Sequence, residues 1–276
     1  MPKQLSADAV RRFNEHGYLS PLSLLNAEQT KRYRQCLADF EAHEGGQIKG
    51  QKRNKSHLFL KWLDELVHHP AILDAVEDLL GPDILLFHAQ WFIKEPNTPN
   101  FVSLHQDSAY WGLDRPEGVS AWIAFEDSDA ENGCMQVIPD THKVLLEHVD
   151  KIEPTNMLWR GQTVASALDE GKIVNMALKA GEMSLHHARI VHGSGPNRSN
   201  RRRIGYSVRY IPASVGRHGP RESAGLARGT DRGNFEIEPR PARDYDPEAV
   251  RYHEMVTSRY MKNYMSAQAE SKRAKA

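Results

Sequence analysis

His105, Asp107 and His192 are the side chains with which this sequence could bind a catalytic metal ion. Two imidazoles and one carboxylate can occupy one face of an iron(II) octahedron and leave the other positions open for a cosubstrate and oxygen. Arg203 follows His192 by eleven positions, and its planar guanidinium suits bidentate capture of a carboxylate. These four residues therefore predict a non-haem iron centre with a carboxylate-binding site beside it.

A second triplet with the same spacing, His148 to Asp150, competes with the first, and a chain with 14 histidines can contain such a triplet by chance. We prefer the first because residues 100–104 and 108–111 around it are rich in strand-favouring and aromatic types. Residues 143–147 lack aromatics and indicate helix or loop. On a strand, His105 and Asp107 would share one face, which we expect to point between the sheets.

His186 and His187 are rivals for the third ligand. The residue eleven positions after His186 is an asparagine, and the one after His187 is Arg198, which follows a turn-forming Pro-Asn pair. Neither histidine is followed at eleven positions by an arginine in a strand-forming run, as His192 is by Arg203. We therefore prefer His192, for which the alternative is an ordinary turn histidine beside glycines.

Strand alternation from residue 203 places Arg203, Gly205 and Ser207 on one face, which we expect to face inward. The neighbouring Arg201 and Arg202 are then expected in solvent.

Four stretches in order resemble the phytanoyl-CoA dioxygenase family of Fe(II)- and 2-oxoglutarate-dependent oxygenases. They are His105-Gln-Asp107, Val119-Ser-Ala-Trp-Ile-Ala-Phe-Glu126, Glu131-Asn-Gly-Cys-Met-Gln-Val-Ile-Pro-Asp-Thr-His142 and Val191-His-Gly-Ser-Gly-Pro-Asn197. The resemblance covers residues 6–210. It implies a double-stranded β-helix, also called a jelly roll and cupin-like, with Fe(II) as cofactor, 2-oxoglutarate as cosubstrate and O2 as oxidant.

The resemblance also implies roles for single residues. Ser194 would share the distal carboxylate of 2-oxoglutarate with Arg203, and Trp122 would form the aromatic wall of that pocket, unless it is an ordinary core tryptophan. Gln90 matches a position that lines the cosubstrate site, although the human phytanoyl enzyme has methionine there. Related halogenases replace the carboxylate ligand with a small residue, so the presence of Asp107 favours hydroxylation.

Two irregular segments, residues 45–56 and 150–172, are long enough to cover an open metal site. The first carries Arg53 and Lys55, which we predict to favour an anionic or zwitterionic substrate; the alternative is a solvated charged face. The second carries Trp159, a further candidate for substrate binding.

The composition limits the function classes. The 276 residues carry 36 Lys and Arg against 36 Asp and Glu, which argues against nucleic-acid or membrane-surface binding. Cys36 and Cys134 follow no metal or redox spacing and indicate reduced thiols in a cytoplasmic protein. We find no secretory signal, no run of about 18 apolar residues and no peroxisomal ending. The last departs from the peroxisomal member of the family and weakens the case for an acyl-CoA substrate.

The pattern of elements predicts one mainly β domain with flanking α-helices. Helices are expected at 7–16, 27–43 and 71–80, so residues 1–81 form a mostly helical cover. Residues 82–212 form the jelly-roll core, with strands at 84–94, 119–125, 135–138, 173–178, 182–187 and 203–210. Residues 213–276 are expected to form a loop at 216–243, a helix at 246–265 and a frayed tail at 266–276.

The sequence therefore predicts an oxidoreductase that hydroxylates a small, polar or anionic metabolite and releases succinate and CO2. Alternatives within the family are an acyl-CoA hydroxylase and a phosphonate- or hypophosphite-type oxidase. A metal-dependent cupin that does not use 2-oxoglutarate is a further possibility. A catalytically silent binding protein of the same fold is the alternative from another class.

Overall fold

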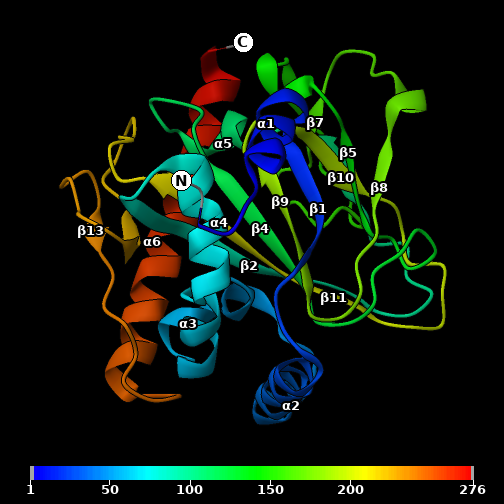
Figure 1. Cartoon of the computed structure of the whole chain (residues 1–276). Helices are drawn as coiled ribbons and strands as arrows, with labels where there is room; N and C mark the ends of the chain where they lie inside the picture. Colours follow the sequence, from blue (N-terminus) through cyan, green and yellow to red (C-terminus); the bar gives the residue numbers. More distant parts are fainter. Residues whose placement is uncertain (1–2, 275–276) are drawn as a thin grey trace.

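A computed structural model describes residues 3–274 and shows two β-sheets packed face to face with helices along one outer side (Figure 1). The large sheet has the order β1-β9-β4-β11-β2-β12-β13, and the small sheet has the order β3-β10-β5-β8. This arrangement confirms the predicted jelly roll with flanking helices. The strands of the large sheet are β1 (Tyr18–Ser23), β2 (Ile84–Lys94), β4 (Val119–Ala124), β9 (Glu182–His187), β11 (Arg203–Pro212), β12 (Ser223–Arg228) and β13 (Glu236–Ile237).

The small sheet consists of β3 (Val102–His105), β5 (Met135–Ile138), β8 (Val174–Met176) and β10 (Val191–Ser194). A separate hairpin pairs β6 (His148–Asp150) with β7 (Gln162–Val164). Side chains of β4, including Trp122 and Ala124, pack against Met135 and Val137 of β5, so the two sheets enclose a common core.

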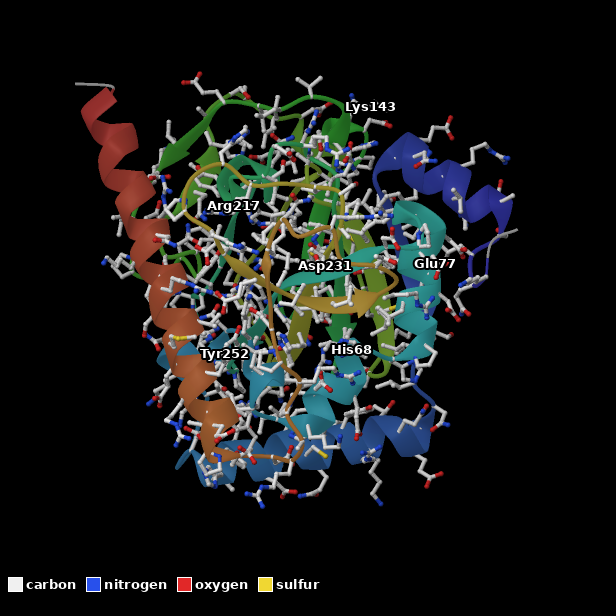
Figure 2. All side chains as sticks on the ribbon, turned by 90° about the vertical axis from the view of Figure 1, so that its left-hand side faces the viewer. His68, Glu77, Lys143, Arg217, Asp231 and Tyr252 are labelled. Atoms are coloured by element: carbon white, nitrogen blue, oxygen red, sulfur yellow. The ribbon has the colours of Figure 1, made fainter. Side chains whose placement is uncertain are left out.

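The helices α1 (Ala7–His16), α2 (Ala27–His43), α3 (Lys61–Val67) and α4 (Pro70–Leu80) pack on the outer face of the large sheet, together with the first turn of α6 (Pro247–Ala274). The short α5 (Ser108–Trp111) lies elsewhere, and its Trp111 packs against Phe87 and Ile211. Single 3₁₀ turns lie at Gly50–Arg53, Ser56–Leu58, Thr141–Lys143 and Glu170–Lys172. Figure 2 shows α6, which carries Tyr252, running along one side of the molecule. None of the helices in residues 3–274 combines the length and the apolar composition that a membrane crossing requires.

Local sequence signals explain where the first helices begin and end. The Ser6 hydroxyl accepts the amide of Ala9, and Gly17 ends α1 with φ of 83° in the left-handed region. Asn26 and Gln29 form a reciprocal capping box at the start of α2.

Several elements differ from the sequence-based expectations. The pattern at 18–25 predicts a strand interrupted by Pro21; the edge strand β1 instead runs through Pro21, at a register shift between Leu19 and Leu22. The helix α3 was not predicted, because its seven residues span only two turns, too few for a clear helical period. His148–Asp150 forms a strand and not a helix or loop, since residues 162–164 pair with it.

The C-terminal region also differs. The segment expected as a loop at 216–243 contains β12 and β13, which extend the large sheet beyond β2. The helix α6 continues to Ala274 through most of the predicted tail at 266–276, whose alanine, glutamate, glutamine and lysine residues favour helix. Residues 275–276 lie outside the described part.

Candidate metal centre

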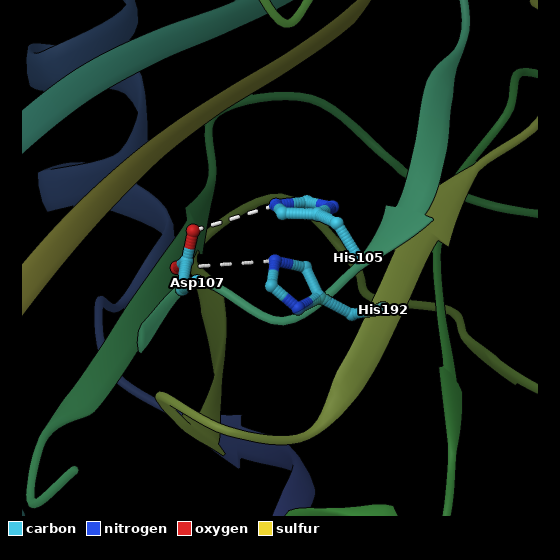
Figure 3. Close-up of side chains that lie close together, drawn as sticks. All are labelled: His105, Asp107 and His192. Carbon is cyan, nitrogen blue, oxygen red and sulfur yellow. Dashed lines mark ion pairs between the residues drawn. The ribbon is translucent and has the colours of Figure 1, made fainter. Parts of the chain in front are cut away.

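His105 and His192 lie directly opposite each other on neighbouring strands. β3 and β10 pair antiparallel with His105 in register with His192, and the two ring centroids are 4.3 Å apart. Figure 3 shows both rings pointing toward Asp107. Strand pairing therefore brings together two candidate ligands that are 87 positions apart in the sequence.

Backbone carbonyls fix the orientation of both rings. The Nδ1 of His105 donates to the carbonyl of Ser103 at 2.9 Å, and the Nδ1 of His192 donates to the carbonyl of Ile190 at 3.0 Å. Each hydrogen bond places the proton on Nδ1 and leaves Nε2 with a free lone pair, which is the tautomer that a metal ligand needs.

Asp107 completes the cluster from a turn and not from a strand. β3 ends at His105, and Asp107 has helical dihedral angles (φ −55°, ψ −45°) at the start of α5. Its Oδ1 lies 3.4 Å from His105 Nε2, and its Oδ2 lies 3.9 Å from His192 Nε2. The predicted alternation on one strand is therefore wrong in detail, because the chain turns after His105, but the carboxylate still meets both rings.

Gln106, between the two ligands, anchors this turn. Its side-chain amide donates to the carbonyls of Thr141, Val144 and Arg189, and its Oε1 accepts the amide of Leu146. The side chain is fully buried. This network holds the backbone that carries His105 and Asp107, so the pair is positioned before any metal binds.

Electrostatics keep the cluster ready for a cation. Burial opposes ionisation of Asp107, but Arg209 and the two histidines outweigh it and hold the pKa of this carboxyl well below its ordinary value. Burial is also the main reason that the pKa of His192 is lowered to about 4. Within residues 3–274, His105, Asp107 and His192 are the one group of three whose ligand atoms all lie within 4.8 Å of one another. An anionic carboxylate and two neutral imidazoles fit a divalent metal ion.

The rival histidines have other surroundings. His148 Nε2 accepts the amide of Gln106, and Asp150 pairs with Arg160 at 2.8 Å, so the second triplet stabilises the β6–β7 hairpin. His187 lines neither cavity, and its ring lies near that of Phe13, with 6.3 Å between the centroids. His186 is buried beside His192, with 4.7 Å between ring centroids, and neither of its nitrogens has a partner.

An inner cavity of about 380 Å³ extends from the metal cluster to Arg203. It is lined by both sheets: Phe92, Val102, His105, Asp107, Trp122, Met135, His186, His192, Gly193, Ser194, Arg203, Ser207 and Arg209. The predicted inward face of β11 agrees with this lining, which includes Arg203 and Ser207. Arg202, expected in solvent, instead pairs with both Glu41 and Glu95, and its side chain is 31% exposed.

The arginine end of this cavity fits an anion. Arg203 is buried, its guanidinium lies 5.4 Å from the Trp122 ring, and its Nε and Nη2 have no partner. Burial lowers the pKa of Arg203 only to about 10, so the group stays charged at neutral pH. A buried guanidinium without an acceptor is costly, and a carboxylate entering this cavity would satisfy it.

Ser194 lies at the same end, two residues after His192, and lines the inner cavity. Its Oγ accepts a hydrogen bond from Lys94 Nζ at 2.7 Å. Sequence reasoning missed Lys94, which is the last residue of a mostly apolar strand. Only the register of β2 with β11, which sets Lys94 opposite Arg203, shows its position.

Gln90 does not line the inner cavity. It faces an outer cavity of about 560 Å³, solvent at its mouth included, which shares His105, Asp107 and Arg209 with the inner one. The rest of its lining is Asn54, His88, Gln90, Tyr110, Trp111, Met157, Leu158, Trp159, Gln162, Tyr260 and Met261. Trp159 stands at the mouth with 52% of its surface exposed. The contributions of α6 and of Arg209 were not predicted, although one further step of the alternation Arg203-Gly205-Ser207 reaches Arg209.

Arg53 and Lys55 line neither cavity. Arg53 donates to the carbonyl of Trp91 at 3.3 Å. Lys55 is buried and forms an ion pair with Glu238, so its charge is already compensated inside the protein. Asn54 is the residue of this basic segment that faces the outer cavity.

Comparison with known proteins gives consistent matches. The sequence model of the phytanoyl-CoA dioxygenase (PhyH) family matches residues 13–205. The peroxisomal phytanoyl-CoA dioxygenase of Bos taurus is 32% identical over 153 residues, which are 52% of this chain and 44% of that protein. A probable alpha-ketoglutarate-dependent hypophosphite dioxygenase of Stutzerimonas stutzeri is 27% identical over 228 residues, 73% of this chain and 78% of that protein. The solved structure of the non-heme monooxygenase ThoJ in its apo form superimposes with a TM-score of 0.83 at 33% identity, over 95% of this chain and 99% of that one.

The jelly roll, the His–Asp–His cluster and the buried arginine define the class of 2-oxoglutarate-dependent non-haem iron oxygenases. The chain belongs to the phytanoyl-CoA dioxygenase family, since the family model matches well over half of its length. The cofactors of this class, Fe(II) and 2-oxoglutarate, fit the donor set and the orphaned guanidinium described above. The chain spans less than half the length of the bovine relative, so that enzyme's acyl-CoA substrate does not transfer with the family.

Proposed function

We propose that this protein is a dioxygenase that hydroxylates a small organic metabolite, polar or anionic, and converts 2-oxoglutarate and O2 to succinate and CO2. The observation that carries the proposal is a single cavity with a His–Asp–His cluster at one end and an unpartnered buried guanidinium at the other. Fe(II) held there would supply the oxidising power for attack on a C–H bond when 2-oxoglutarate and O2 are bound.

The residues of the chain divide this work. His105, Asp107 and His192 hold the metal. Arg203 and Ser194 hold the far carboxylate of 2-oxoglutarate, and the Trp122 ring closes that end against water. Gly205 leaves room for the ring, since a Cβ at this position would lie 1.9 Å from Trp122 Cζ2.

The substrate is proposed to enter the outer cavity, where Gln90 and Trp159 would contact it. Arg209 is the one residue of lysine or arginine type among the described lining residues of this cavity. Its Nε lies 3.4 Å from Asp107 Oδ2, and the other donors of its guanidinium favour an anionic group on the substrate. Four aromatic side chains, Tyr110, Trp111, Trp159 and Tyr260, favour an organic body over an ion as small as hypophosphite, which offers no apolar surface to pack against them.

The first experiment measures succinate formed from 2-oxoglutarate by the iron-loaded protein, alone and with a panel of small carboxylates, amino acids, phosphonates and acyl-CoAs. We expect turnover that is stimulated by one class of small acid. Asp107→Ala should abolish it, because the metal loses its one anionic ligand. Asp150→Ala is the matched control from the rival triplet, because Asp150 pairs with Arg160, and it should keep turnover. Loss in Asp150→Ala with retention in Asp107→Ala would reverse the assignment.

The cosubstrate site has its own test. Arg203→Leu should weaken 2-oxoglutarate binding by roughly 2–5 kcal/mol, as expected for one partner of a buried charge pair, with little change in iron binding. Lysine should rescue poorly at this position, because a point charge does not reproduce the planar fork. Calorimetric titration of the anaerobic iron-loaded protein measures both affinities. Unchanged 2-oxoglutarate affinity in Arg203→Leu would exclude this role.

A further inference from the structure

Lys94 and Arg203 form a pair of buried basic side chains without a carboxylate between them. They are in register on the neighbouring strands β2 and β11, and their exposed fractions are 0% and 2%. Lys94 has no acidic partner among the described residues. Two like charges in one apolar interior repel each other and favour an anion that neutralises them.

The hydrogen bonds of Lys94 are directed at the cosubstrate end of the inner cavity. Its Nζ donates to Ser194 Oγ at 2.7 Å, to the carbonyl of Gly133 at 3.4 Å and to the carbonyl of Gly195. All three donors of an ammonium group therefore have acceptors. The lysine does not line the cavity, so its influence on the cavity passes through Ser194, which does.

The turn at Asn132 and Gly133 leaves the space in which Lys94 Nζ approaches the carbonyl of Gly195. Gly133 has φ of 75°, and a Cβ there would lie 2.5 Å from the carbonyl oxygen of Gly195 and 3.1 Å from Lys94 Nζ. Asn132 fixes the turn by donating to the carbonyl of Asp127 and accepting the amide of Asp129. The Asn-Gly pair of the sequence motif at 131–142 thus shapes the site in which the ammonium group lies.

A hydroxyl that accepts a hydrogen bond from an ammonium group has its own hydrogen left to donate. For Ser194 the cavity is the open direction, because Lys94 is its hydrogen-bond partner within the protein. The hydroxyl would then point its hydrogen at an oxygen placed beside Arg203.

We propose that Lys94 is the second cation of the cosubstrate site: it fixes Ser194 as a hydrogen-bond donor and adds its charge to that of Arg203 behind the far carboxylate of 2-oxoglutarate. This inference rests on the proposed binding of 2-oxoglutarate by Arg203 and Ser194. Lys94 is a positioning residue, since it acts through Ser194.

The proposed role of Lys94 links the binding of 2-oxoglutarate to the uptake of a proton. Burial, with Arg203 adding to it, lowers the pKa of Lys94 to about 6 in the free protein. The titratable groups that face it are Arg203 on β11 and the Cys134 thiol, whose pKa burial raises to about 11. Lys94 is then mostly neutral at neutral pH, and an arriving carboxylate raises its pKa and binds with uptake of a proton. Affinity for 2-oxoglutarate should therefore fall as pH rises above about 6.

The test is calorimetric titration of the anaerobic iron-loaded protein with 2-oxoglutarate, in buffers of different ionisation enthalpy at about pH 7.5. Wild type should take up close to one proton per site. Lys94→Met should bind about tenfold more weakly or worse, without proton uptake and with a flatter pH dependence. Cys134→Ala is the control for the other facing group and should keep the uptake.

The possible results distinguish the role of Lys94 from the proposed function of the protein. Wild-type binding with no proton uptake would overturn the protonation step, and this measurement needs no variant that might misfold. Lys94→Met that binds as tightly as wild type would overturn the role of Lys94 itself. If Arg203→Leu then still loses binding, the proposed function stands alone. Wild-type protein that does not bind 2-oxoglutarate would remove both.

Discussion

At the scale of single residues, packing around the site determines which amino acid a position can carry. Gly205 shows this most clearly. It lies on β11 two residues after Arg203, and the edge of the Trp122 ring occupies the space where a side chain would begin. The glycine has no positive φ to explain it, so its role is to let the tryptophan reach the guanidinium.

Gly205→Ala should therefore displace Trp122, weaken 2-oxoglutarate binding and lower the free energy of unfolding by about 1–3 kcal/mol, as overpacking does. Denaturant unfolding and calorimetric titration measure the two effects. Gly225→Ala is the matched control in the same sheet, because its new Cβ would meet Leu86 at an ordinary 3.6 Å. Equal behaviour of the two variants would show that the sheet absorbs the clash and that the ring position matters little.

At the scale of elements, the segment at 150–172 is attached to the strand that carries the first ligand. Phe101 pairs with the chain at Asn156, whose side-chain amide donates to Ser103 Oγ at 2.9 Å, and the Ser103 hydroxyl donates to the carbonyl of Gln162. The segment predicted as a covering loop is thus held by hydrogen bonds, and it places Met157, Leu158 and Trp159 in the outer cavity.

Ser103→Ala should release this attachment while the Ser103 carbonyl still orients His105. We expect amide hydrogen exchange in residues 155–164 to rise by about tenfold, the effect of losing one or two hydrogen bonds. Ser120→Ala is the control, because its buried hydroxyl on β4 has no partner. Exchange that rises equally in both variants would indicate general loosening, and exchange that rises in neither would show that other contacts hold the segment.

Sequence patterns identified the elements with strong local signals and missed those defined by pairing. The caps at Ser6 and Asn26 and the runs at 84–94 and 182–187 gave their boundaries directly. β12 lacks a local signal because its Gly-Arg-rich sequence becomes a strand only beside β2. The metal cluster could be predicted because each ligand belongs to a short motif. Lys94 and Arg209 could not be placed in the same way, because their roles follow from which strands are neighbours.

At the scale of the whole molecule, the basic segment near residue 53 is bound to the C-terminal helix α6. Gln51 accepts the hydroxyl of Thr257 at 3.1 Å, and the carbonyl of Asn54 accepts His253 Nε2 at 2.8 Å, so α6 is fixed over this segment. His88 hydrogen-bonds Asn54 and stacks on Tyr260 at 4.8 Å. The C-terminal helix therefore completes the outer cavity, which places a wall of the proposed substrate site outside the residues matched by the family model.

Lys55 and Glu238 form the buried ion pair at the centre of this junction, with side-chain exposures of 3% and 1%. Burial opposes ionisation of Glu238, but Lys55 and His57 outweigh it and lower the pKa of this carboxyl to about 2 from an ordinary 4.5. A folded-state pKa below the unfolded one means that the stabilisation is fully present above about pH 4.5. It is lost as pH falls from there toward 2.

Glu238→Gln should therefore lower the free energy of unfolding by roughly 3–5 kcal/mol at neutral pH, because Lys55 is left buried without its counter-charge. The difference from wild type should shrink as pH falls below about 4.5, which denaturant unfolding over a pH series measures. Glu236→Gln is the matched control two residues away: its carboxylate is 41% exposed and pairs with Arg259, so the effect should stay below about 1 kcal/mol. If the two variants differ from wild type equally, or if the deficit of Glu238→Gln is the same at every pH, the buried ion pair does not stabilise the contact between Lys55 and Glu238.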